Sequence, residues 1–131
     1  MTEFINFKSV KRPPKPNTCL VAPENYTLAA EPDFAPPSLD MEADALFAKL
    51  LEIVSSERRW SKLESDEMSK KIKFVATTGL MRFKDDVDIE IIPISETKAT
   101  LAIYSRSRVG YSDLGANRKR VDDLIRRVTT N

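Results

Sequence analysis

The stretch from Ile103 to Arg120 is the part of the chain richest in side chains that can recognise an anion. It reads I-Y-S-R-S-R-V-G-Y-S-D-L-G-A-N-R-K-R and holds five of the seven Lys and Arg residues that follow position 100. Guanidinium groups bind phosphate and carboxylate groups through paired, charge-assisted hydrogen bonds. This stretch is therefore the first candidate for a ligand site.

The residue types suggest separate roles within this candidate site. Three guanidinium groups would donate to the anion, a phenol and an amide would orient it, and nearby carboxylates would position the arginines. The predicted ligand-binding residues are Arg106, Arg108, Tyr111, Asn117 and Arg118, and the supporting residues are Asp85, Asp86, Asp113 and Arg120. The free N–H groups at the start of a following helix would add further donors. The ligand would be an anionic small molecule, a lipid head group or a carboxylate of a protein partner.

Two other readings of the same residues stay open. The arginines and aspartates could form an internal network that only orders this corner, in a structural or interaction domain. Alternatively, the Asp85/Asp86 pair could do acid–base chemistry in a hydrolase if burial shifted a carboxylate pKa. Ser105, Ser107 and Ser112 have no histidine or lysine arranged to activate them. The sequence therefore favours a binding domain over an enzyme.

Composition narrows the function further. There is no histidine and a single cysteine, Cys19, which excludes an internal disulfide and the usual zinc and haem sites. No calcium-loop motif is present, and we expect neither a metal nor a cofactor. The 21 basic and 20 acidic residues give a net charge of +1, and this balance argues against a nucleic-acid partner.

Hydropathy gives an expectation for location. No apolar run approaches the roughly 20 residues of a membrane span. The first twelve residues lack the apolar segment of a secretory signal. We therefore expect a small soluble domain without a transmembrane segment, located in the cytoplasm, where a single thiol stays reduced.

The elements that must position the site follow from periodicity. Residues 1–37 hold seven of the eight prolines and predict an extended arm lying on the domain, with an edge strand near Tyr26–Ala30. Apolar spacing predicts a helix over 40–56, capped by Ser38 or Asp40. Alternation predicts strands over 58–66, 70–78, 84–94 and 98–108. Residues 38–131 would then form a single α+β domain.

The last two strands predict a hairpin whose register can be argued. Their apolar residues face each other only if a three-residue loop, Ser95–Thr97, joins them. Ile89 then pairs with Ile103, and on the opposite face Asp86 lies across from Arg106 and diagonal to Arg108. Charge pairing between the two strands is therefore expected beside the candidate site.

A final helix is predicted over 113–128, capped by Ser112 or Asp113. Its apolar stripe, extended backward by one turn, falls on Asn117, a polar residue on the buried face that must find hydrogen-bond partners. Two helices around four or five strands suggest an antiparallel sheet with both helices on one face. The order β-α-β4-α is that of helix-grip and TATA-box-binding-protein-like folds.

The sequence S-R-S-R-V-G-Y-S-D-L-G-A-N-R-K-R at Ser105–Arg120 resembles the C-terminal signature of the domain-of-unknown-function family 1499. The resemblance extends to F-K-D-D-V at Phe83–Val87 and more loosely to P-N-T-C-L-V-A-P at Pro16–Pro23. It implies a small bacterial or plastid domain without assigned chemistry.

Overall fold

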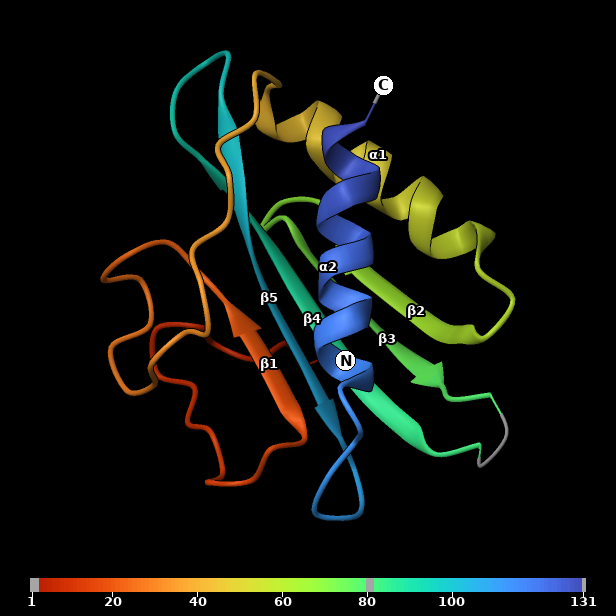
Figure 1. The fold of residues 1–131 in the computed structure, drawn as a ribbon. Helices are drawn as coiled ribbons and strands as arrows, with labels where there is room; N and C mark the ends of the chain where they lie inside the picture. Colours follow the sequence, from red (N-terminus) through yellow and green to blue (C-terminus); the bar gives the residue numbers. More distant parts are fainter. Residues whose placement is uncertain (1–2, 80–81, 131) are drawn as a thin grey trace.

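The protein folds around an antiparallel sheet of five strands in the spatial order β1-β5-β4-β3-β2 (Figure 1). We describe residues 3–79 and 82–130 from a computed structural model. The strands are β1 (Thr18–Val21), β2 (Trp60–Asp66), β3 (Lys71–Thr77), β4 (Lys84–Pro93) and β5 (Ala99–Ser107), and the helices are α1 (Ala43–Ser56) and α2 (Ala116–Thr129). The α+β class with an antiparallel sheet is confirmed, whereas the likeness to a helix-grip or TATA-box-binding-protein fold stays a prediction.

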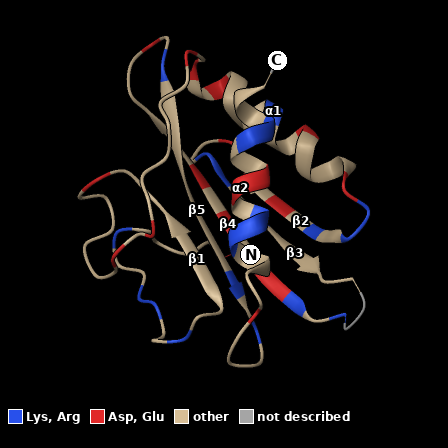
Figure 2. Ribbon diagram, viewed as in Figure 1, with Lys and Arg blue, Asp and Glu red and all other residues tan. Residues whose placement is uncertain are grey.

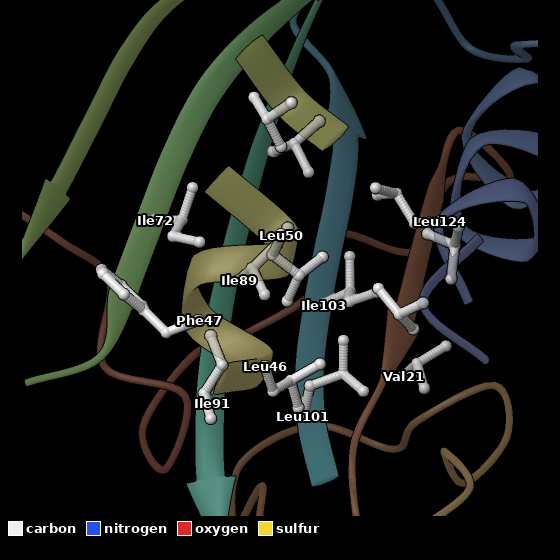
Figure 3. Close-up of a cluster of buried hydrophobic side chains, with 14 of the residues drawn as sticks. Val21, Leu46, Phe47, Leu50, Ile72, Ile89, Ile91, Leu101, Ile103 and Leu124 are labelled. Carbon is white, nitrogen blue, oxygen red and sulfur yellow. The ribbon is translucent and has the colours of Figure 1, made fainter. Parts of the chain in front are cut away.

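The main core lies between the sheet and the two helices, which both pack on the same face (Figures 1 and 3). Side chains alternate across a strand, so every second residue of each strand points to the helices. These side chains are almost completely buried and include Ile72, Val87, Ile89, Leu101 and Ile103 from the strands and Leu46, Leu50, Val121 and Leu124 from the helices. Each such side chain contributes about 1.5–3 kcal/mol when it is removed from water.

The other face of the sheet is covered by the N-terminal arm, which we define as residues 3–37. Phe7 of the arm is 2% exposed and packs with Leu20, Ala102 and Tyr104 in a second apolar cluster. Lys73 Nζ donates to the backbone oxygen of Glu3 at 2.8 Å. Because both faces are covered, β1 and β5 bury side chains on both of their sides.

The predicted register of the β4–β5 hairpin is confirmed. Ile89 pairs with Ile103 and Asp86 pairs with Arg106. The N–H of Ile94 donates to the oxygen of Lys98 at 2.9 Å, closing the three-residue loop. Matching of apolar faces was sufficient to fix this pairing, because a shift of one residue would have turned Ile89 toward the wrong face.

The first strand differs from the prediction. It is Thr18–Val21, whereas the residues near Tyr26–Ala30 form turns and bends. In Thr18–Val21, Val21 enters the main core and Leu20 enters the second cluster, which suits a strand covered on both faces. Leu28, by contrast, is 77% exposed. The sheet thus takes a strand from within the arm, and the division into an arm and a domain stays a prediction.

Both helices begin later than predicted. The N-cap of α1 is Glu42, so Ser38 and Asp40 do not cap it. The N-cap of α2 is Gly115, in the left-handed region with φ 83°. Leu114, with φ 54°, is in the same region. Two consecutive left-handed residues cannot belong to a right-handed helix, which delays the start of α2 to Ala116.

Candidate functional site

The predicted site residues lie on two opposite faces of the sheet. Along β5, Ser105 and Ser107 point to the helices, whereas Arg106 points to the face covered by the arm. Arg108, just beyond the strand, reaches Asp86 of β4. We call the helix-side group the inner network and the arm-side group the outer charge cluster, and the two are separated by the sheet itself.

The inner network is organised by the side chain of Asn117, which is fully buried in the first turn of α2. Its two amide atoms have five hydrogen-bond partners, three of which share the two hydrogens of Nδ2. The nitrogen Nδ2 donates to Asn17 O at 2.9 Å, Ser107 Oγ at 2.9 Å and Asp113 Oδ2 at 2.7 Å, and the oxygen Oδ1 accepts from Ser105 Oγ at 2.6 Å and Arg120 Nη1 at 2.9 Å. Asn117 therefore ties α2 to β5 and to the residue before β1.

Arg120 and Asp85 form a buried ion pair at the edge of this network. Their side chains are 9% and 1% exposed, and Arg120 Nη2 lies 2.9 Å from Asp85 Oδ2. Within the described residues, neither carboxylate oxygen of Asp85 has a partner in good hydrogen-bond geometry. The attraction to Arg120 is thus the main compensation for burying this carboxylate.

The carboxylate of Asp113, three residues before α2, accepts two backbone hydrogen bonds at the start of the helix. Its Oδ1 accepts from the N–H of Gly115 at 2.8 Å and its Oδ2 accepts from the N–H of Asn117 at 3.0 Å. Burial alone would raise the pKa of Asp113, but the hydrogen bonds from Asn117 and Gly115 outweigh it and lower that pKa. The predicted N-cap is therefore wrong, since Gly115 holds that position, but the Asp113 carboxylate still binds two N–H groups at the start of the helix.

The outer charge cluster consists of Arg106, Arg108, Asp86 and Asp88. Arg106 Nη1 lies 2.8 Å from Asp88 Oδ2, and its guanidinium covers the Tyr104 ring at 4.8 Å. Arg108 binds Asp86 through two hydrogen bonds of 3.0 and 2.9 Å. The hydrogen bond from Arg108 lowers the pKa of Asp86, whereas burial raises the pKa of Asp88. Each arginine of the cluster thus already holds a carboxylate.

A pocket of about 230 Å³ opens beside the outer charge cluster. Its charged lining is balanced, with the cations Lys62, Lys73, Arg106 and Arg108 and the acids Glu3, Glu64, Asp86 and Asp88. An anion entering this pocket would have to displace carboxylates that are already bound. The pocket is therefore poorly suited to the anionic ligand predicted for this stretch.

Two predicted residues, Arg118 and Tyr111, belong neither to the inner network nor to the outer charge cluster. Arg118 pairs with Asp122 one turn further along α2 and covers the Phe34 ring at 4.3 Å. Tyr111 is 67% exposed in the loop between β5 and α2. The structure therefore does not bring Arg106, Arg108 and Arg118 together around one anion. The carboxylates of Asp85 and Asp86 also point to opposite faces, so they offer no shared acid–base site.

Replacing Arg108 with alanine is expected to change the free energy of unfolding by less than about 1 kcal/mol, because an exposed ion pair is weakened by solvent. The Arg108 and Asp86 side chains are 44% and 34% exposed. Urea denaturation of the variant and of Lys98→Ala, which removes another exposed pair, should give similar small changes. A loss several times larger for Arg108→Ala alone would contradict this assignment.

A second pocket, which sequence reasoning missed, lies where β2 begins, β3 ends and β4 begins. We call it the basic groove. Its volume is about 550 Å³, and it is lined by Arg58, Arg59, Ser61, Thr77, Thr78, Gly79, Arg82 and Lys84. No acidic side chain is among these residues, and over residues 3–79 and 82–130 none of the four basic side chains has an ion pair. Basic segments flank this end of the sheet in Figure 2.

Strand pairing assembles the basic groove from two distant parts of the sequence. The N–H of Thr77 donates to the oxygen of Arg59 at 2.8 Å, so the start of β2 lies against the end of β3. Lys84 then pairs with Thr77 across β3 and β4. The signal was present as R-R at the start of one predicted strand and R-F-K at the start of another. An antiparallel meander brings those two starts to the same end of the sheet.

Gly79 contributes to the shape of the basic groove. A Cβ atom at this position would lie 2.5 Å from Arg59 Nη1, so the guanidinium of Arg59 rests directly on the glycine backbone. Any other residue would displace the end of that flexible side chain. The position of Arg59 therefore depends on the absence of a side chain at position 79.

Comparison with known proteins gives a family and no activity. A search of curated proteins finds no match to the chain. Over the described residues, no helix has the length and apolar character needed to cross a membrane. The family model of DUF1499, described as a protein of unknown function, matches residues 10–128. The match includes all five strands, α1 and all but the last residue of α2, and the chain therefore belongs to the DUF1499 family.

Proposed function

We propose that this protein is a binding domain for an anionic ligand and that the ligand is held in the basic groove. The main support for this proposal is that one set of basic residues is paired with carboxylates and another set is not. Arg106, Arg108 and Arg120 are each paired with a carboxylate. The four basic residues of the groove line one pocket without an acid.

Electrostatics favours the groove over the 105–120 stretch. Four like charges at one end of a sheet repel one another, and an anion placed among them relieves that repulsion. In the outer charge cluster, the same anion could bind the arginines only by breaking their ion pairs with Asp86 and Asp88. The anion-binding role expected for the 105–120 stretch is therefore better supported at the groove.

The chemistry of the lining indicates the class of ligand. Guanidinium groups present paired N–H donors that match the oxygens of phosphate and carboxylate groups. The hydroxyl groups of Ser61, Thr77 and Thr78 lie in the same lining and can donate to further oxygens. A phosphoryl group, with several oxygens and more than one negative charge, makes the fullest use of these donors.

The inner network supports the alternative of a purely structural role for the 105–120 stretch. Asn117 and Asp85 are buried, and Arg120 contacts both of them with a side chain that is 9% exposed. A stretch that orders the corner of the sheet and a groove that binds the anion are compatible in one molecule. The two regions thus have different roles.

Calorimetric titration with pyrophosphate tests the proposal. We expect binding by the native protein and a loss of about 10–100-fold in affinity for Arg82→Ala, which is the range for one hydrogen bond to a charged group. Gly79→Ala should weaken binding as well, because it displaces Arg59 without changing the charge. Its φ is not in the left-handed region, so alanine fits the backbone.

Arg108→Ala is the matched control, because it removes a guanidinium from the outer charge cluster and leaves the groove intact. Its pyrophosphate affinity should equal that of the native protein. If Arg108→Ala abolishes binding while Arg82→Ala and Gly79→Ala retain it, the ligand binds at the predicted 105–120 stretch and the groove assignment is wrong. Absence of heat at millimolar pyrophosphate would overturn both.

A further inference from the structure

The end of the sheet that carries the basic groove also exposes a set of large apolar side chains. We call them the apolar tip: Phe83, Val109, Tyr111 and Leu114, which are 47%, 57%, 67% and 90% exposed. They come from the residue before β4 and from the loop between β5 and α2. The N–H of Arg108 donates to the oxygen of Lys84 at 3.2 Å, which joins these two segments.

The apolar tip has no role in the core. None of its four residues belongs to the main core or to the second apolar cluster. Leu114 also has left-handed backbone geometry, with φ 54°, in which a leucine side chain is unfavourable. Several exposed apolar side chains at one end of a molecule indicate an interaction surface.

The charges at this end narrow the choice of partner. The basic groove supplies Arg58, Arg59, Arg82 and Lys84 beside the apolar tip. The acids next to the groove residues in the sequence are already paired, Glu57 with Arg127, Asp85 with Arg120 and Asp86 with Arg108. Figure 2 shows the same end of the ribbon with basic segments at the α1–β2 connection and before β4. A partner that matches this end therefore carries negative charge at its surface and an apolar layer beneath that charge.

We propose that this end of the protein docks on the surface of an anionic lipid membrane. Apolar and aromatic side chains enter the boundary between head groups and acyl chains, and the basic side chains bind lipid phosphates and carboxylates. Each basic residue close to such a surface increases binding by about fivefold. The inference rests on the proposed anion site and identifies its ligand as a lipid head group.

Co-sedimentation of the full chain with lipid vesicles tests this inference. Vesicles of phosphatidylcholine and phosphatidylserine in a ratio of about 7:3 should bind the native protein, and pure phosphatidylcholine should not. The double variant Tyr111→Ser/Leu114→Ser should lower the partition coefficient at least about tenfold, since it removes two apolar side chains from the boundary. Arg59→Ala/Arg82→Ala should lower it to a similar extent.

Met68→Ser is the matched control, because Met68 is 95% exposed in the turn between β2 and β3 at the opposite end of the sheet. It should bind the mixed vesicles like the native protein. Thermal unfolding followed by circular dichroism confirms that each surface variant is folded before sedimentation.

Two measurements distinguish failure of the anion site from failure of membrane docking. The double variant at the apolar tip should bind pyrophosphate like the native protein, because the groove is unchanged. If the native protein binds pyrophosphate but not the mixed vesicles, the anion site stands and membrane docking is wrong. Docking is equally overturned if the double variant sediments like the native protein, or if Met68→Ser loses as much binding.

Discussion

Replacing Arg120 with alanine is expected to lower the free energy of unfolding by about 3–5 kcal/mol, the usual range when one partner of a buried ion pair is removed. The variant leaves the Asp85 carboxylate 1% exposed with no cation beside it. Neither oxygen of Asp85 has a well-aligned hydrogen bond within the described chain that could replace the lost attraction. Urea denaturation followed by tryptophan fluorescence and circular dichroism measures the loss.

The matched control is Arg126→Ala, which removes an arginine of the same helix whose side chain is 69% exposed. Its free energy of unfolding should change by less than about 1 kcal/mol. The double variant Arg120→Ala/Asp85→Ala should recover part of the loss, because it no longer buries an unpaired charge. Equal effects of Arg120→Ala and Arg126→Ala would show that the Asp85 pair is not buried in solution.

Replacing Asn117 with alanine is expected to cost about 3 kcal/mol, since a buried polar group left without a partner costs roughly 1–3 kcal/mol and several partners are affected. The backbone oxygen of Asn17 and the hydroxyls of Ser105 and Ser107 all lose a bond to its side chain. The higher helix propensity of alanine returns only about half a kcal/mol. Urea denaturation gives the net value.

Hydrogen exchange can locate the effect of Asn117→Ala. The Asn117 side chain joins α2 to the residue before β1, so amides of Thr18–Val21 should exchange faster in the variant than in the native protein. Lys119→Ala, two residues along the same helix on its exposed face, is the control and should leave this exchange unchanged. Uniform loss of protection over the entire sheet would argue against a local tie at β1.

The β4–β5 hairpin and the buried asparagine could be predicted because both depend on local periodicity. Ile89 and Ile103 share one face only in a single register, and that register also set Asp86 beside Arg106. The helical repeat that contains Val121 and Leu124 reaches Asn117 four residues earlier. A polar residue at a buried position must be hydrogen-bonded, and the inner network meets that requirement.

The predicted site was a single one, although the same patterns, taken together, separate its residues onto two faces. Arg106 alternates with the apolar residues of β5, whereas Asn117 lies on the stripe of α2 that faces those residues. Combining the two patterns puts the sheet between them. Density of charge along the sequence was a weaker guide than the direction of each side chain.

The first strand and the basic groove could not be obtained from local patterns. Thr18–Val21 is too short to show alternation, and its pairing with β5 depends on the arm covering the outer face. Arg59 and Arg82 are separated by the β2–β3 hairpin and meet only through strand pairing. The balanced net charge of +1 concealed a local excess of positive charge.

The strand order has a consequence for synthesis of the chain. Thr18 pairs with Arg106, so β1 leaves the ribosome long before its partner β5 exists. The β3–β4–β5 meander has short connections and is free to form as soon as it emerges, because nearby segments lose little entropy on closure. Leu20 and Phe7 pack with Ala102 and Tyr104 of β5, so they cannot be buried there before β5 has been made. Of the five strands, β1 is thus the first to be made, and it can pair only after the other four have been made.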